Sequence, residues 1–119
     1  MEKRDLRMYI LVNKNLNMSV GKACGQVGHA VASYFYKSND KNIDEYMSNE
    51  QKKIILACPQ NRLEELEKEG YISIRDKGYT EIEPNSLTCV NYGIVDYSKV
   101  GDKCGYDVIP KWIRRLRLY

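Results

Sequence analysis

The stretch "NMSVGKACGQVGHAVASYFY", residues 17–36, decides how the rest of the chain is interpreted. Ser19 is a credible N-cap, because its hydroxyl can accept a hydrogen bond from an unpaired N–H of the first turn. Apolar residues follow at helical spacing. They predict a buried stripe made of Val20, Cys24, Val27, Val31 and Phe35. The stretch therefore predicts a long helix with one face against a core.

The same helix has features that oppose helix formation. Gly21, Gly25 and Gly28 each cost about 1 kcal/mol relative to alanine, and we expect them to let neighbouring backbone come close. A lysine at position 22 places a positive charge where the helix dipole is already positive. A lysine beside a helix N-terminus is typical of a phosphate or oxyanion site. A surface lysine turned into solvent fits the position equally well. Opposite the predicted stripe, one face carries Lys22, Gln26, His29 and Ser33.

Working outward, the chain alternates between strand-like and helix-like segments. The predicted strands are residues 7–14, 52–58, 71–76 and 86–94. The predicted helices are residues 19–36, 40–49, 59–70 and a last one from about Asp107, with Pro110 in its first turn. Residues 95–105 read as a loop. The order β-α-α-β-α-β-β-α predicts a single α/β domain over residues 1–119, with a four-stranded mixed sheet flanked by helices. The last two strands should be antiparallel, because too few residues join them for a helical crossover.

Composition and charge restrict the class of protein. A chain of 119 residues is long enough for a substantial core. Its apolar runs are far shorter than the roughly 20 residues that span a bilayer, and it shows no secretion signal. We therefore expect a soluble, cytoplasmic protein without a membrane segment. The net charge is +3, but residues 40–70 carry −3, which leaves +6 elsewhere. This asymmetry is compatible with a polyanionic partner or with a solvated basic face.

The cysteines argue against a metal site. They are Cys24, Cys58, Cys89 and Cys104, with no CxxC pair and only one histidine in the chain. Ligands of a structural zinc ion usually occur at shorter, paired spacings. We expect reduced cysteines, the first three of them in the core, and no metal.

Two single residues are candidates for chemistry. His29 is the only histidine, and it suits either a catalytic role or the orientation of a neighbouring group. Asp76 closes the third predicted strand, where a carboxylate can face a site or simply form the turn. The residues alone leave both alternatives open.

Two separated blocks resemble a known family. They are "LNMSVGKACGQVGHA", residues 16–30, and "DKGYTEIEPNSLT", residues 76–88, and the chain closes on "LRLY". They are similar to the L-x-M-x-x-G-K-x-x-x-Q-x-x-H-A and D-x-G-x-T-x-I-x-P-x-S-x-T patterns of the type 2 peptidyl-tRNA hydrolases of archaea and eukaryotes. The resemblance implies an α/β domain that often forms homodimers. It also implies hydrolysis of the ester that joins a peptide to tRNA, without a cofactor.

The resemblance also implies a set of site residues. Lys22, Asp76 and Thr88 would be catalytic. The surrounding substrate-binding residues would be Gln26, His29, Gly21 and Thr80. Ester hydrolysis needs a positioned, deprotonated water and donors for the oxyanion. Asp76 would orient or activate the water, Lys22 would stabilise the oxyanion or a phosphate, and Thr88 would bond to water or substrate. An ordinary aspartate titrates at about 3.9, so strong base catalysis would need a raised pKa; the alternative is catalysis by positioning.

The chain also departs from the family pattern. Val20 and Tyr79 stand where the family commonly has lysine and arginine, and the segment after Thr88 carries an insertion. Other cations would have to contact the tRNA phosphates, with Arg75, Lys77, Lys99, Lys103 and the tail "KWIRRLRLY" as candidates. Two alternatives stay open: an inactive RNA- or protein-binding module of the same fold, and a hydrolase of a smaller ester or amide.

Overall fold

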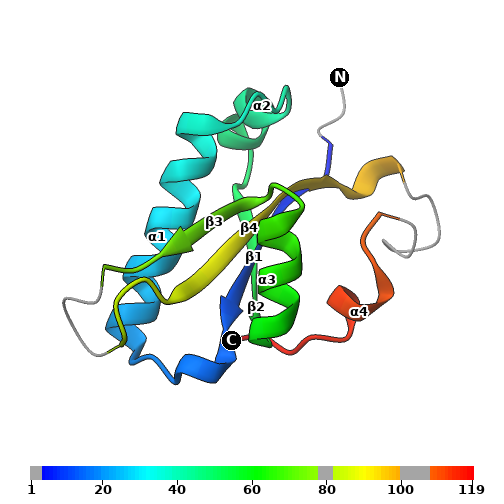
Figure 1. The fold of residues 1–119 in the computed structure, drawn as a ribbon. Coiled ribbons are helices and arrows are strands. Elements are labelled where there is room, and N and C mark those ends of the chain that lie inside the picture. Colours follow the sequence, from blue (N-terminus) through cyan, green and yellow to red (C-terminus); the bar gives the residue numbers. More distant parts are fainter. Residues whose placement is uncertain (1–3, 78–81, 100–107) are drawn as a thin grey trace.

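A mixed four-stranded sheet lies at the centre of the computed structural model, which describes residues 4–77, 82–99 and 108–119 (Figure 1). Its strands are β1 (Leu6–Asn13), β2 (Lys52–Cys58), β3 (Ile72–Arg75) and β4 (Leu87–Asp96), in the order β2-β1-β4-β3. β1 pairs in parallel with β2 and antiparallel with β4. β3 and β4 are antiparallel, as the short connection predicts. β3 is therefore an edge strand.

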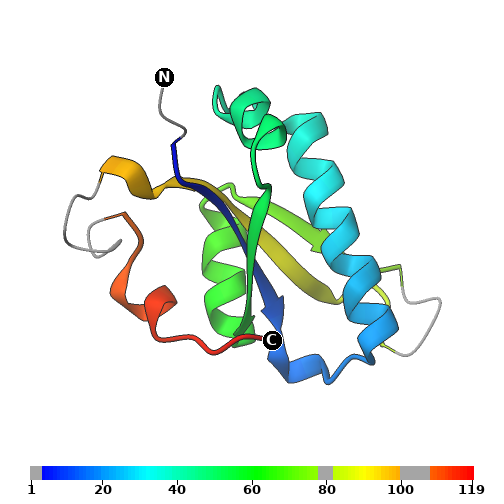
Figure 2. The ribbon, with the colours of Figure 1, turned by 180° about the vertical axis from the view of Figure 1, so that it is seen from behind.

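Helices cover both faces of this sheet (Figures 1 and 2). The helices are α1 (Val20–Lys37) and α2 (Ile43–Ser48) on one face, and α3 (Gln60–Lys68) and α4 (Lys111–Arg114) on the other. Side chains of a strand alternate between faces, so the apolar run of β1 supplies both cores. Met8 and Ile10 enter the core beneath α1, while Leu11 enters the core beneath α3. The predicted element order and α/β class are confirmed.

Several predicted boundaries shift. β4 continues through Val95 and Asp96, which were predicted as loop, because both pair with β1. The last helix begins at Lys111, directly after Pro110; its predicted start at Asp107 lies outside the described residues. Gly70 ends α3 with a φ of +98°, a conformation that favours glycine at a helix C-terminus.

The carboxyl-terminal tail covers the outer edge of β2. Leu118 forms an antiparallel bridge with Leu56. On either side of it, the Ala57 N–H donates to the Arg117 carbonyl at 2.8 Å and the Tyr119 N–H donates to the Ile55 carbonyl at 3.0 Å. A covered edge no longer offers unpaired backbone groups. The two sheet edges therefore differ. The tail covers the outer edge of β2, whereas within the described residues no strand pairs with the outer edge of β3.

The prediction of which face of α1 is buried is wrong: the buried residues lie about one position before those of the predicted stripe. The buried residues are Ala23, Gln26, Ala30 and Tyr34. The residues of the predicted stripe are only partly buried or, at Val20 and Cys24, exposed. The reason is that the polar groups of Gln26 and Tyr34 have hydrogen-bond partners in Thr88 and Asp40, which makes their burial favourable despite their polarity.

Two further expectations about α1 are wrong. A Cβ added at Gly21, Gly25 or Gly28 would meet nothing within 4 Å, so no neighbouring backbone in the described part of the chain requires these glycines. Cys24 is exposed rather than in the core. The other two expected core cysteines, Cys58 and Cys89, are buried as predicted; they are called the core cysteines below.

Candidate active site

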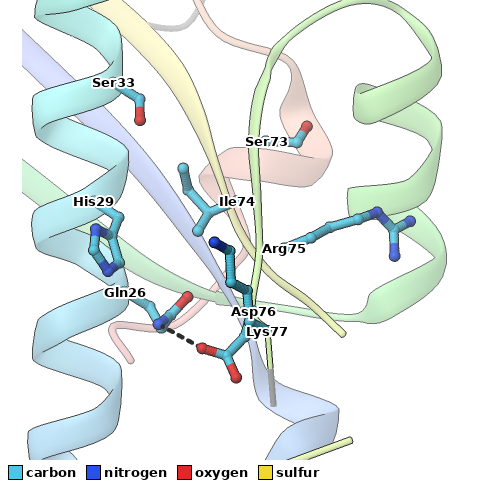
Figure 3. Close-up of a pocket in the computed structure, with 8 residues that line it drawn as sticks. All are labelled: Gln26, His29, Ser33, Ser73, Ile74, Arg75, Asp76 and Lys77. Atoms are coloured by element: carbon cyan, nitrogen blue, oxygen red, sulfur yellow. Dashed lines mark hydrogen bonds between the residues drawn. The ribbon is translucent and has the colours of Figure 1, made fainter. Parts of the chain in front are cut away.

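A cavity of about 490 Å³ lies between α1 and the edge strand β3 (Figure 3). Its lining residues come from these two elements and the turn after β3: Gln26, His29, Ser33, Ser73, Ile74, Arg75, Asp76 and Lys77. The volume lies in the range of small-molecule sites. The cavity therefore brings together the polar face of α1 and the carboxylate that closes β3, two features about 50 residues apart in sequence.

Lys22 and Asp76 form an ion pair beside this cavity. Lys22 occupies the first turn of α1, where the Ser19 hydroxyl accepts the Lys22 N–H at 3.3 Å and confirms the predicted N-cap. Its ammonium Nζ donates to Asp76 Oδ1 at 2.7 Å. Each of the two side chains is only 11% exposed. Lys22 is therefore not a lysine turned into solvent: its charge is held next to the cavity.

Gln26 connects this ion pair to Thr88. The Gln26 side-chain amide Nε2 donates to Asp76 Oδ1 at 3.2 Å, as the dashed line in Figure 3 shows. Its carbonyl Oε1 accepts the Thr88 hydroxyl at 2.6 Å. Gln26 is 4% exposed and Thr88 is fully buried. Because a carboxylate only accepts hydrogen bonds, Asp76 and the Thr88 hydroxyl together fix the orientation of the Gln26 amide that points Nε2 at the carboxylate.

A β-bulge places Thr88 in this network. Ile74 pairs with Cys89 and Arg75 pairs with Leu87, which leaves Thr88 as the extra residue of β4. Bulges redirect a side chain out of the regular alternation of a strand. The Thr88 hydroxyl also lies 3.1 Å from the Ile74 carbonyl. Thr88 thus contacts protein groups on all sides in this structure and reaches the cavity only through Gln26.

The other predicted substrate-binding residues lie in different places. His29 is exposed and lines the cavity one turn beyond Gln26. Gly21 is exposed in the first turn of α1, and Thr80 lies outside the described residues. The cavity also includes Ser73 and Ile74, which sequence reasoning missed. No motif in the sequence around them marks them as functional. They line the cavity because β3 is an edge strand.

Arg75 lines the cavity but is engaged by neighbours. Its guanidinium forms an ion pair with Glu67 of α3 at 2.7 Å and donates to the Asn85 carbonyl at 2.7 Å. The hydrogen bond from Arg75 lowers the pKa of the Glu67 carboxyl. Lys77 also lines the cavity, and both residues are exposed. Of these two predicted phosphate ligands, Arg75 is the one that Glu67 and the Asn85 carbonyl already hold.

The end of the basic tail lies at one edge of the sheet, and this cavity lies at the opposite edge. Residues 117–119 pair with β2, and three interstrand gaps separate β2 from β3. At 4.7–4.9 Å per gap this is about 14 Å. The side chain of Lys99 and all of Lys103 lie outside the described residues. The tail and Lys22 therefore lie in different parts of the molecule.

The buried thiol nearest the network is chemically inert. Cys89 follows Thr88, and its Sγ donates to the Gln26 backbone carbonyl at 3.3 Å. Burial raises the pKa of the Cys89 thiol to about 12, which disfavours the thiolate that would act as nucleophile. Across residues 4–77, 82–99 and 108–119, no three histidine, cysteine or acidic side chains gather into a group that could hold a metal ion. The polar groups in and beside the cavity are ammonium groups, a carboxylate, an amide, an imidazole, a guanidinium and two hydroxyls.

No helix within the described ranges has both the length and the apolar character needed to cross a membrane.

Most of this chain is similar in sequence to known proteins. Residues 6–104 match the family model described as Peptidyl-tRNA hydrolase PTH2. A peptidyl-tRNA hydrolase of Thermoplasma volcanium is 35% identical over 98 residues, covering 74% of this chain and 84% of the relative. One from Methanopyrus kandleri is 32% identical over 96 residues (73% and 83%), and one from Methanocaldococcus jannaschii is 29% identical over 111 residues (85% and 96%). This chain belongs to the peptidyl-tRNA hydrolase PTH2 family.

Proposed function

We propose that this protein hydrolyses the ester bond between a peptide, or an N-blocked amino acid, and tRNA. Family membership supports the activity. The observation that carries the proposal in the structure is the hydrogen-bonded series Lys22–Asp76–Gln26–Thr88 beside a cavity of about 490 Å³. It supplies a carboxylate for a water and a cation for an oxyanion, which are the two requirements of ester hydrolysis.

Asp76 orients the attacking water in this mechanism. Its carboxylate is held by Lys22 and Gln26, both of which donate to Oδ1. The carboxylate accepts a hydrogen bond from a water and takes its proton as the water attacks the ester carbonyl. The same proton then passes to the ribose oxygen as the C–O bond breaks. Positioning supplies much of the rate enhancement, because an ordinary aspartate carboxylate is a weak base.

Lys22 stabilises the negative charge that develops on the carbonyl oxygen. An ammonium has three N–H donors, and the bond to Asp76 Oδ1 uses one of them. The low exposure of the Lys22 side chain strengthens its interaction with an oxyanion, since fewer water molecules screen it. Thr88 acts as a positioning residue, because it fixes the Gln26 amide that holds the carboxylate.

The first test is release of the acyl group from N-acetyl-aminoacyl-tRNA. We expect turnover by the parent protein, and a fall in kcat of about 10²–10³ for Lys22→Ala, the magnitude for loss of one oxyanion donor. Asp76→Asn should be similarly impaired. Lys41→Ala is the matched control, since Lys41 is exposed in the segment before α2 and does not line the cavity. Parent activity that survives both site substitutions would contradict the proposed mechanism.

The same assay separates the alternatives. Binding of tRNA without turnover would indicate a recognition module of the same fold. Turnover of a small ester at the same rate and with little salt dependence would indicate a smaller substrate, because release of counterions makes tRNA binding strongly salt-dependent.

We also propose that the reaction is independent of metal ions and takes place in the cytoplasm, where translation supplies the substrate. The charge of Lys22 provides the electrostatic role that a metal would otherwise have. Dialysis against EDTA should leave kcat unchanged, and a loss restored by added metal would contradict this.

A homodimer is the quaternary state that we propose. Val20 is 81% exposed and Tyr36 is 89% exposed, at the two ends of α1. The three glycines between them leave the outer face of α1 open to close approach. Light scattering coupled to gel filtration should give twice the chain mass, and a monomer at assay concentration would refute the dimer.

A further inference from the structure

We propose that the outer edge of β3 is a peptide subsite, on which the peptide part of the substrate adds as an extra strand parallel to β3. The inference rests on the proposed function, because it takes the ester to lie at Lys22 and Asp76. It assigns a binding role to backbone groups of Ser73 and Arg75, which neither the sequence motifs nor the side-chain network involves.

The hydrogen bonds of β3 show which of its backbone groups face outward. The Asp76 N–H donates to the Ser86 carbonyl at 2.9 Å, and the Asp76 carbonyl accepts the Asn85 N–H at 2.6 Å. The Ile74 carbonyl lies 3.1 Å from the hydroxyl of Thr88 in β4. Positions 74 and 76 therefore face β4. In an antiparallel strand this orientation alternates, so the N–H and C=O groups of Ser73 and Arg75 point away from β4.

The cavity reaches this backbone edge. In Figure 3 the side chains of Ile74 and Asp76 point toward α1, whereas those of Ser73 and Arg75 point to the other side of the strand. All four residues nevertheless line the same cavity. A cavity in contact with side chains on both sides of a strand must pass along its edge. Within the described ranges, β3 pairs with β4 alone, so this edge is not occupied by another strand.

The cavity is also elongated in the direction of the strand. Gln26 and Asp76 lie at one end and Ser33 and Ser73 at the other (Figure 3). Seven residues of helix rise about 10 Å at 1.5 Å each, and three residues of strand rise about 10 Å at 3.3 Å each. The two walls thus extend over the same length, which accommodates about three residues of extended peptide beginning at the ester.

The chemistry of the substrate favours recognition through backbone. Peptides attached to tRNA differ in side chains, and the groups they share are backbone N–H and C=O. A strand edge recognises these groups whatever the sequence. With the ester at Asp76, the peptide runs from Ser73 toward Asp76, in the direction of β3. The substrate residue opposite Ile74 then donates its N–H to the Ser73 carbonyl and accepts the Arg75 N–H at its own carbonyl.

The test uses four substrates on one tRNA: N-acetyl-aminoacyl-tRNA, N-acetyl-tetrapeptidyl-tRNA, and two tetrapeptidyl-tRNAs N-methylated at the second or at the third residue from the ester. We expect a KM about 3- to 10-fold lower for the tetrapeptide than for the single residue, at similar kcat. N-methylation should remove this gain at one of the two adjacent positions and leave it at the other. A KM equal for one and four residues, or an equal effect of both methyl groups, would overturn the inference.

Protein variants provide a second, independent readout. Arg75→Pro removes the outward N–H, and proline is tolerated at the exposed side of an edge strand. It should equalise KM for the tetrapeptide and the single residue, whereas Arg75→Ala, which removes only the side chain, should preserve their ratio. A preserved ratio in Arg75→Pro would overturn the inference. If this variant does not fold, the N-methyl comparison decides alone.

The two possible failures are distinguishable. Absence of turnover on all four substrates refutes the proposed function, and the subsite with it. Turnover with the same KM on all four refutes the peptide subsite only and leaves the hydrolase intact.

Discussion

The most informative single substitution is Thr88→Val. The family resemblance implies that Thr88 bonds to water or substrate, whereas in the structure its hydroxyl is 2.6 Å from Gln26 Oε1 and fully buried. Valine has nearly the same shape as threonine without the hydroxyl. The substitution therefore removes the group that orients the Gln26 amide and changes little else. We expect Asp76 to lose a well-oriented donor and the reaction to slow.

The magnitude follows from one buried hydrogen bond. Such a bond contributes about 0.5–1.5 kcal/mol, which corresponds to a fall in kcat of about 2- to 13-fold if all of it serves to orient Gln26. The Gln26 carbonyl left without its donor lowers the free energy of unfolding by about 1–3 kcal/mol. KM should change little, because the hydroxyl does not reach the cavity.

Thr88→Ser is the matched control. It keeps the hydroxyl and removes a buried methyl group, which costs about 1 kcal/mol of stability. Both variants are therefore destabilised, but only the valine variant should lose kcat. The assay is single-turnover and steady-state hydrolysis of N-acetyl-aminoacyl-tRNA, with urea unfolding of each protein.

Two results would refute this reasoning. If kcat of the valine variant stays within twofold of the parent although its stability falls, the orientation of Gln26 does not matter for the reaction. If the serine variant is as slow as the valine variant, packing around position 88 matters rather than its hydroxyl.

Three further predictions concern the fold. Gly93 has a φ of +110°, and a Cβ there would lie 3.2 Å from the Tyr34 hydroxyl. Gly93→Ala should therefore strain the backbone and lower the free energy of unfolding, measured in urea, by about 1–3 kcal/mol. An unchanged free energy of unfolding would contradict this strain. The hydrogen bond from Arg7 lowers the pKa of the Asp5 carboxyl from 3.8 to about 2, so its stabilisation is present above about pH 4 and is lost as the pH falls toward 2. Between those values the parent should lose up to about 1 kcal/mol more stability than Asp5→Asn, and equal losses would exclude the contribution. Iodoacetamide should label Cys24 in the native protein and the core cysteines only after unfolding, because burial raises the pKa of both core thiols to about 12. Peptide mass spectrometry identifies the labelled residues, and labelling of the core cysteines before Cys24 would contradict the fold.

Much of the local structure was predictable from sequence. The limits of β2 at residues 52–58, the cap at Ser19 and the end of α3 at Gly70 all match the structure. Each depends on interactions within a few residues: alternation of apolar side chains, a hydroxyl near a free N–H, or a glycine that adopts a positive φ. Lys22 was a candidate because a lysine beside a helix N-terminus is typical of an anion site, and Asp76 because a carboxylate that closes a strand can face a site.

The placement of two candidate site residues was not predicted from sequence, because it depends on distant partners. Gln26 was predicted on the exposed face of α1 but is 4% exposed. Its burial is favourable only because β3 and β4 bring Asp76 and Thr88 within hydrogen-bonding distance. Thr88 in turn faces Gln26 because of a bulge that the pairing of β4 with β3 creates.

The sequence by itself therefore determined the elements, their order and the charged residues at their ends, because these follow from contacts between near neighbours in the chain. Only the tertiary structure decided which face of α1 is buried, how Gln26 joins Asp76 to Thr88, and that the edge of β3 opens onto the cavity. The physical reason is that a polar side chain is stable in the interior only where a partner meets it, and the fold supplies that partner from a remote segment.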